Sequence, residues 1–448
     1  MTDVGRKSVD GSITLRKIVA LCTAGGFLDG YSLLIMSAAL LLLIPRFKMA
    51  QSTVGLVTAI PFIGMAIGAL IAGQLSDKFG RRLVFLIDVT AFLIVDILLG
   101  FSQNVGELVV LRFILGLAIG ADMPTSSSML AEFSPPKLRG ALTSLLNTVW
   151  LFGFIVAGIV GYILYQTGSL EAWRWMFFSA AVPALIVVIL RRDVPETPRW
   201  LRASGRVEEA KIVEQKIISS GLDTSHVEVS AQRGQFSEVF KNGNWKPVLF
   251  FASYWFIQSI AGAPLLSYTA VIFHRVIKFS GANALLFSVG LSCLYVIFSL
   301  ITQFTVLERS GRKSLAVWTC AITAVGAVVT AFVSHVTVLL VIAYAVAIVA
   351  SQLTVIPYWP WSVEMLPTQI RATGQSIGSA GGKVGAFLGT LLLPSFLAAT
   401  GWTVSFLTVT VIFIVVLLIV AIFGKETKNR SLDTAEGISD PSVPMSTH

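Results

Sequence analysis

The amino-acid sequence predicts an all-α integral membrane protein with twelve transmembrane helices in two pseudo-symmetric six-helix bundles. Three observations support this prediction: the apolar composition, the spacing of long apolar runs, and a repeat that relates the two halves of the chain. Of the 448 residues, 55% are hydrophobic and only 13% are charged, and the mean hydropathy is +0.81. Soluble domains carry roughly 25% charged residues, so this chain has more apolar surface than a soluble core could bury.

A membrane-spanning helix needs about 20 mostly apolar residues, and the chain holds twelve such runs. They cover residues 18–45, 52–75, 83–101, 106–132, 139–165, 173–190, 247–273, 281–306, 314–333, 336–364, 370–397 and 402–423. The first run is too long for a signal-peptide core, so we expect it to be retained as a span. The expected organisation is a cytoplasmic N-terminus (1–17), a first six-helix bundle (18–190), a cytoplasmic linker with a short surface helix (191–246), a second six-helix bundle (247–423) and a cytoplasmic tail (424–448).

The positions of Lys and Arg predict the orientation of these spans. With both termini inside the cell, the cytoplasmic segments hold 26 of the 33 basic residues and the external loops hold 4. Basic residues concentrate in cytoplasmic loops, so we expect a multi-pass protein of the plasma membrane with both termini in the cytoplasm. The net charge of +9 therefore has a topological cause, and nucleic acid is not an expected partner.

The two halves of the chain repeat a pattern at matching positions. GQLSDKFGRR (73–82) follows the second span and LERSGRK (307–313) the eighth, while AEFSPPKLRGAL (131–142) follows the fourth and VEMLPTQIRATG (363–374) the tenth. Such a repeat is typical of transporters whose site lies between the halves. Opposite charges at these helix ends can hold helices together in one conformation only, although simple topology marking is the alternative. The candidate latch residues are Asp77, Arg81, Arg82, Glu132, Arg139, Glu308, Arg312, Glu364 and Arg371.

These loops resemble those of the major facilitator superfamily over nearly the whole chain. GQLSDKFGRR resembles its signature loop after the second span, and VPETPRWL (194–201) and KETKNRSLD (425–433) resemble signatures of its sugar porters. The resemblance implies a secondary transporter that works by alternating access. A proton gradient is the expected energy source and no cofactor is expected. We do not expect an enzyme, because the sequence shows no nucleotide-binding loop, metal-ligand cluster or catalytic triad spacing.

Charged residues inside the apolar runs are the main candidates for function, since each costs at least a few kcal/mol in a membrane. Asp29 and Asp122 lie in the middle third of their runs, and Arg112 lies about 15 Å from Asp122 toward the external side. We predict that Asp29 carries a proton, shared with Asp122, and that Arg112 tunes their pKa values. The alternative is a carboxylate permanently paired with an arginine. Asp88 and Asp96 lie nearer the ends of their run and are expected to reach water or a helix end.

Lys383, in the eleventh run, predicts an anionic substrate, because a lysine at that depth must pair with a carboxylate or bind an anion. The resemblance adds two points. Ser32 stands where sugar porters place the aspartate that faces their span-four arginine. The DGY segment that begins at Asp29, like the basic residue 383, is similar to aromatic-acid and phosphate proton symporters. The residues predicted to bind substrate with Lys383 are Tyr31, Asn147, Tyr254, Trp255, Gln258, Tyr358 and Trp359.

The predicted function is therefore a proton symporter of a small anion, such as an aromatic or other carboxylic acid or phosphate. A sugar or polyol carrier of the same fold is the alternative, which VPETPRWL and Trp359 favour and Lys383 opposes. A membrane receptor that binds a ligand without flux is a third hypothesis. Because one chain holds both halves of the cavity, we expect it to function as a monomer whose partners are a solute, protons and lipids.

Overall fold

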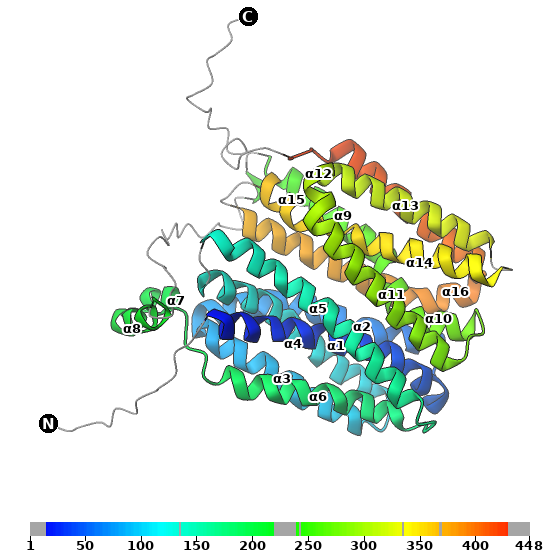
Figure 1. Ribbon diagram of the computed structural model, residues 1–448, viewed down its shortest axis with the longest axis horizontal. Helices are drawn as coiled ribbons and strands as arrows, with labels where there is room; N and C mark the ends of the chain where they lie inside the picture. Colours follow the sequence, from blue (N-terminus) through cyan, green and yellow to red (C-terminus); the bar gives the residue numbers. More distant parts are fainter. Residues whose placement is uncertain are drawn as a thin grey trace, which may run out of the picture.

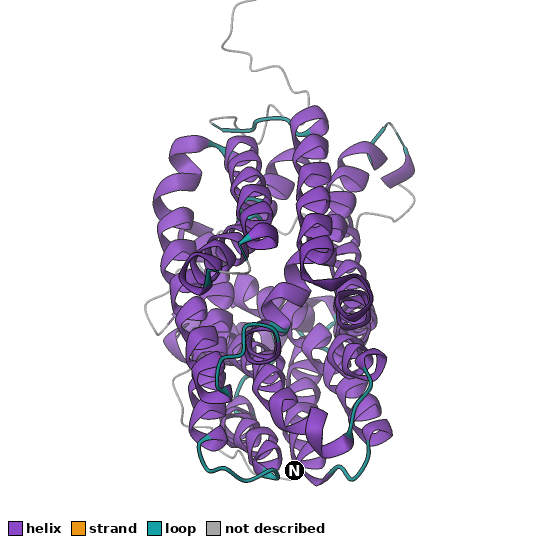
Figure 2. Cartoon of the chain, turned by 90° about the vertical axis from the view of Figure 1, so that its right-hand side faces the viewer, coloured by secondary structure: helices purple, strands orange, loops and turns teal. Residues whose placement is uncertain are grey.

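The computed structural model describes residues 15–133, 136–218, 239–241, 243–333, 336–366 and 370–428. Throughout these residues the chain folds into helices and loops, and no strand is present among them (Figure 2). Within the same residues, 10 helices are long and apolar enough to cross a membrane. One of them, Thr373–Phe423, has 51 residues and so can cross twice, since about 20 residues suffice for one crossing.

Six long helices form the N-terminal bundle. Helix α2 packs along α4, α1 along α5, and α3 along α6. Two short helices, α7 (Pro198–Ala203) and α8 (Val207–Ile218), follow this bundle and project from it (Figure 1). The bounds of the six are α1 (Leu15–Phe47), α2 (Gln51–Phe79), α3 (Arg81–Phe101), α4 (Val105–Phe133), α5 (Pro136–Tyr165) and α6 (Ala172–Arg191).

The C-terminal bundle repeats this arrangement with more interruptions. Helix α9 packs along α16 as α1 does along α5, and α13 packs along α16 as α3 does along α6. Proline and glycine mark two of its breaks, at Pro357 before α15 and at Gly401, where the φ of +79° bends α16 between its two crossings. The elements are α9 (Trp245–Ser267), α10 (Thr269–Arg275), α11 (Gly281–Ile301), η2 (Thr302–Val306), α12 (Leu307–Ser310), α13 (Arg312–Phe332), α14 (Thr337–Leu353), α15 (Tyr358–Met365) and α16 (Arg371–Phe423).

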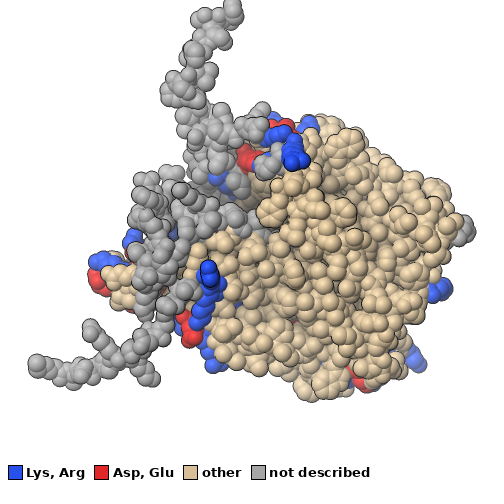
Figure 3. Space-filling view, in the orientation of Figure 1, with Lys and Arg blue, Asp and Glu red and all other residues tan. Residues whose placement is uncertain are grey.

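We call the end of the molecule that carries the start of α1, the end of α16 and helices α7 and α8 the termini face, and the other end the far face (Figure 1, left and right). Charged side chains gather at these two ends, and a broad band without charge separates them (Figure 3). Such a band fits the apolar interior of a bilayer, where an exposed charge is costly.

The bundles meet along two symmetry-related seams, α2 against α16 and α5 against α11. At the far face they touch closely: a Cβ on Gly55 would lie 2.2 Å from the carbonyl oxygen of Leu391. The Tyr268 hydroxyl crosses the same seam to the carbonyl oxygen of Val54 at 3.4 Å, while its shorter bond, to the carbonyl oxygen of Thr390 at 2.9 Å, lies within its own bundle. Small residues and a buried hydrogen bond therefore hold the far face closed in this conformation.

Candidate functional site: a buried charge cluster between the bundles

Arg191, the last residue of α6, is the centre of the most buried charge cluster in the described part of the chain. Its side chain is 0% exposed, and its two terminal nitrogens contact Asp88 Oδ1 at 2.9 Å and Asp122 Oδ1 at 2.8 Å. The carbonyl oxygens of Leu21 and Phe85 accept further hydrogen bonds from the guanidinium. From the sequence, Arg191 is expected at the start of the polar linker, and Asp88 is expected to reach water or a helix end. The structure buries both residues inside the bundle, where Asp88 contacts Arg191 at the end of α6.

The sequence of α1 allows this cluster to form. A Cβ on Gly25 would lie 2.1 Å from Asp122 Oδ2 and 2.4 Å from a terminal nitrogen of Arg191, so only glycine leaves room for the ion pair. On α4, the hydroxyl of Ser126 donates to Asp122 at 3.2 Å. The structure thus pairs Asp122 with an arginine, which was the alternative to its predicted role in proton transfer.

Asp29 lies one turn further along α1 and has no such partner. Its side chain is 1% exposed, and its Oδ1 makes no hydrogen bond to any described residue. The positive charge that faces it from the other bundle is Lys383 of α16, with which it interacts electrostatically. No direct ion pair within 4.0 Å joins these two side chains in the described residues. The cluster therefore spans both bundles through charge rather than through a fixed contact.

Three aromatic residues form a wall beside Lys383. The ring of Trp255 lies 4.3 Å from that of Tyr358 and 5.4 Å from that of Trp359, measured between centroids. Lys383 Nζ lies 6.0 Å from the Trp255 centroid, within the range of a cation–π contact. Four of the predicted substrate residues are thus brought together, and the 43% exposure of Trp359 leaves part of this wall open.

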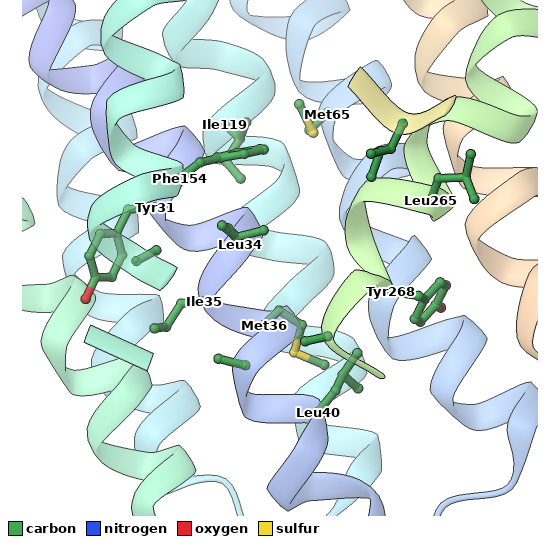
Figure 4. Packing of buried hydrophobic residues seen from close by; sticks show 14 of the residues in the cluster. Tyr31, Leu34, Ile35, Met36, Leu40, Met65, Ile119, Phe154, Leu265 and Tyr268 are labelled. Carbon is green, nitrogen blue, oxygen red and sulfur yellow. The ribbon is translucent and has the colours of Figure 1, made fainter. Parts of the chain in front are cut away.

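The side chains of three other predicted substrate residues form hydrogen bonds within their own bundles. The Tyr31 hydroxyl bonds Ser179 of α6 at 2.7 Å, and its ring points away from Leu265 and Tyr268 of the opposite bundle (Figure 4). Tyr254 donates to the carbonyl of Thr354, and Gln258 donates to that of Ser351 at 3.0 Å. Buried polar groups that already have partners are less available to a substrate. Their predicted role remains untested.

One amide that the sequence analysis did not single out lies closer to the seam. Gln352 of α14 lines a pocket between the bundles together with Leu34 of α1 and Tyr295 of α11. Its Nε2 donates to the carbonyl of Gly262 at 3.0 Å, and this bond does not use the amide oxygen, which can accept from another group. Gln352 carried the same signal as Gln258, a neutral amide within an apolar run, and could have been found by it.

Arg112 lies in the far-face half of the N-terminal bundle, away from the Arg191 cluster. It is 1% exposed, and one terminal nitrogen donates to the carbonyl of Ser32 at 3.0 Å. Its charge acts on Asp96 of α3 rather than on Asp29 or Asp122, whose pKa values it had been predicted to tune. Asp96 was expected to reach water or a helix end; it is 1% exposed, so it does not reach water.

The predicted latch residues lie at the termini face, and those of the second half form a network. Arg312 pairs with Glu364 at 2.7 Å, and Glu426 accepts hydrogen bonds from the backbone N–H groups of Arg312 and Lys313 at the start of α13. Partial burial raises the pKa of Glu426, but hydrogen bonds from Arg312, Lys428, Ser314 and Thr427 outweigh this effect and hold the pKa below its ordinary value. Arg371 bonds the carbonyl of Leu366 at 3.3 Å.

The first half repeats this network with Glu196 in the place of Glu426. The Glu196 carboxylate accepts hydrogen bonds from the backbone N–H groups of Arg81 and Arg82 at the start of α3. Gly80 and Gly311, with φ of +103° and +87°, make the tight turns before α3 and α13. The side chains of five predicted residues lie outside the described part of the structure: Asp77, Glu132, Arg139, Asn147 and Glu308.

Two six-helix bundles that close around buried charges define a membrane transporter with the fold of the major facilitator superfamily. Residues 18–438 match the family model described as "Sugar (and other) transporter". The chain therefore belongs to the sugar-transporter family. It is a transporter and not an enzyme.

Similar proteins agree with this assignment. The chain is 32% identical to YaaU of Escherichia coli (strain K12), whose name assigns it to metabolite transport, with 93% of each chain covered. It is 28% identical to the arabinose-proton symporter of Bacillus subtilis (strain 168), with 94% of each covered. Its fold matches that of the xylose transporter XylE from E. coli, in a partially occluded inward open conformation, with a TM-score of 0.78, 23% identity, and coverage of 93% of this chain and 99% of that one.

Proposed function

We propose that this chain is a proton-coupled symporter of a small hydroxylated metabolite, such as a sugar or polyol, in which Asp29 carries the proton. The observation that supports this most strongly is the charge balance of the central cluster. Asp29, Asp88 and Asp122 supply three carboxylates, whereas Arg191 and Lys383 supply two cations. One bound proton would neutralise the cluster, and Asp29 is its natural site because it has no arginine contact.

The position of Lys383 favours a neutral substrate over the anion that the sequence predicted. An intramembrane lysine requires a counter-charge, and Asp29 supplies one from the opposite bundle. An anionic substrate is therefore not needed to account for Lys383. Relatives named as carriers of arabinose, glucose and xylose support the same choice.

Proton binding at Asp29 would couple to transport because Lys383 belongs to the other bundle. While Asp29 is ionised, its attraction to Lys383 favours conformations in which the bundles are close at this point. Protonation removes that attraction, so the bundles can rock about the bound solute. The excess of basic residues at the termini face leads us to place that face in the cytoplasm, at the plasma membrane.

An aromatic acid is the second candidate substrate, because the aromatic wall beside Lys383 could stack a flat ring. A relative at 27% identity is the niacin transporter NiaP of Acinetobacter baylyi (strain ATCC 33305 / BD413 / ADP1). Lys383→Gln separates the two candidates. It should leave binding of a neutral sugar measurable but abolish binding of an acid, whose carboxylate needs the ammonium.

The test is uptake by purified protein in proteoliposomes under an inward proton gradient. The panel holds arabinose, xylose, glucose and inositol on one side and nicotinate, benzoate and phosphate on the other. We expect gradient-driven accumulation of a member of the first group. Accumulation of an acid only would overturn the sugar assignment, and equal uptake with and without the gradient would overturn proton coupling.

A further inference from the structure

A second group of unsatisfied polar atoms lies in the far-face half of the N-terminal bundle. Asp96 of α3, Arg112 of α4 and Ser32 of α1 are each 1% exposed. No well-aligned hydrogen bond joins the carboxylate oxygens of Asp96 or Nε of Arg112 to a described residue, and the Ser32 hydroxyl lies close enough to Asp96 to bond its carboxylate. Buried polar groups nearly always find partners, so a buried carboxylate without an ion pair to a described residue, beside a hydroxyl and a guanidinium, is a candidate site for binding and release of a proton.

The groups that face Asp96 are few. Helix α4 presents the Arg112 charge, without an ion pair shorter than 4.0 Å, and α1 presents the Ser32 hydroxyl and the Tyr31 phenol. From α6, Arg174 binds the carbonyl oxygen of Gly100 at the end of α3 and pairs with Glu171 at the far face. Helix α2 carries no ionisable residue in its far-face half. Arg112 is thus the one full charge that acts on Asp96 among the described residues.

We propose that Asp96 is a second proton-binding carboxylate of the transport cycle, with Arg112 as the residue that senses its charge. This inference rests on the proposed function, since it assumes that protons drive transport. The ionised Asp96 carboxylate can accept from the Ser32 hydroxyl, and when Asp96 binds a proton its Oδ–H can instead donate to Ser32 Oγ. When the proton leaves, the carboxylate and the Arg112 guanidinium attract each other across a buried, low-dielectric space.

Arg112 links this site to the seam between the bundles. Its charge acts on the Tyr268 phenol as well as on Asp96. The Tyr268 hydroxyl joins the bundles at the far face through the carbonyl oxygen of Val54 of α2, and its bond to Thr390 of α16 positions it from within its own bundle. Protonation of Asp96 removes the counter-charge of Arg112, which leaves its guanidinium free to strengthen its interaction with other polar groups near it, among them the Tyr268 hydroxyl. The charge of Asp96 would in this way bias opening of the far face.

Two assays on the same proteoliposomes separate this role from a structural one. Solute counterflow measures binding and exchange without net proton movement, whereas gradient-driven accumulation requires it. For Asp96→Asn we expect counterflow within about threefold of the unmodified protein and accumulation lowered by at least about tenfold, the loss expected of a missing proton site. Asp96→Glu should retain accumulation. Asp193→Asn, which removes a carboxyl group that is 71% exposed, is the matched control and should change neither assay.

A double variant provides the decisive comparison. If Asp96 only balances the charge of Arg112, then Asp96→Asn/Arg112→Met should restore accumulation, and that result would overturn the inference. We expect the double variant to remain uncoupled. Full accumulation by Asp96→Asn would also contradict the inference, while the proposed function would stand. Absence of gradient-driven accumulation in the unmodified protein would instead refute the proposed function and this inference together.

If Asp96→Asn does not fold, Asp96→Glu still tests the inference. A carboxyl group that is one methylene longer sits at a different distance from Arg112, so the pH midpoint of accumulation should shift by at least about half a unit. An unchanged midpoint would contradict a proton site at this position.

Discussion

Replacing Arg191 by methionine should destabilise the protein strongly, because Arg191 is the shared partner of two buried carboxylates. The variant keeps an unbranched side chain but removes the guanidinium, and so leaves Asp88 and Asp122 without the cation that they contact at 2.9 and 2.8 Å. At an effective dielectric constant of about 20, each contact contributes roughly 6 kcal/mol of attraction. Desolvation offsets much of this, and breaking a buried pair typically costs about 3–5 kcal/mol.

The assay for this prediction is thermal unfolding of the purified protein in detergent. With an unfolding entropy of about 2.1 cal/mol/K per residue, a chain of 448 residues loses about 4 °C in Tm for a loss of 4 kcal/mol. The loss is larger if the N-terminal bundle unfolds alone. Arg192→Met is the matched control, since Arg192 is the next residue and is exposed.

A triple variant tests the cause of the loss. Neutralising both carboxylates together with Arg191, as Asp88→Asn/Asp122→Asn/Arg191→Met, should recover most of the lost Tm, because no buried charge is then left unpaired. If Arg191→Met unfolds at the same temperature as Arg192→Met, the cluster does not carry the stability that its geometry implies, and the reasoning is wrong.

Three further predictions concern the packing and the latch network. Glu426→Gln should lower stability at neutral pH by about 1–2 kcal/mol, since its carboxylate caps the start of α13. The folded pKa of Glu426 lies below the ordinary 4.5, so the contribution of its carboxylate to stability is present above pH 4.5 and is lost as the pH falls through the folded pKa. Unfolding measured against pH should show this dependence in the unmodified protein and not in the variant. Tyr268→Phe should favour opening of the far face by about 0.5–1.5 kcal/mol, the contribution of the one hydrogen bond, to Val54, that crosses between the bundles. Faster labelling of a cysteine placed at Leu34 by an impermeant thiol reagent would show it, whereas unchanged labelling would count against the role of Tyr268. Gly116→Ala should lower the free energy of unfolding by about 1–3 kcal/mol, because the added Cβ would lie 2.2 Å from the carbonyl oxygen of Pro61. Gly290→Ala is the control and should be tolerated, since the space around Gly290 is open. Equal Tm values for the two variants would contradict the close packing of α2 on α4.

The sequence predicted the helices well because span length and apolar composition are local properties. The breaks inside the C-terminal bundle were harder to predict. The tenth run was expected to be one helix over 336–364, but Pro357 separates α14 from α15. The last two runs were expected as separate helices, and the non-helical Gly401 within α16 divides that element between the two runs as expected. Proline and glycine are tolerated within membrane helices, so their presence alone does not locate a break.

The buried charges illustrate what the sequence could not provide. Asp29, Asp122 and Lys383 were found from the cost of a charge within an apolar run. The role of Arg191 was missed because it ends its run beside the exposed Arg192, and such a pair is typical of a topology marker. Its partners Asp122 and Asp88 lie 69 and 103 residues away along the chain, so only the fold brings them together.

The measurement that tests the central claim most directly is proton influx driven by the solute itself. Proteoliposomes loaded with a pH-sensitive dye are given an inward gradient of the accumulated solute and no initial pH gradient. We expect the lumen to acidify as the solute enters, and we expect Asp29→Asn to exchange solute without acidification while Asp193→Asn behaves as the unmodified protein. Solute entry without any change of internal pH in the unmodified protein would contradict proton coupling, and full acidification by Asp29→Asn would remove Asp29 from the mechanism.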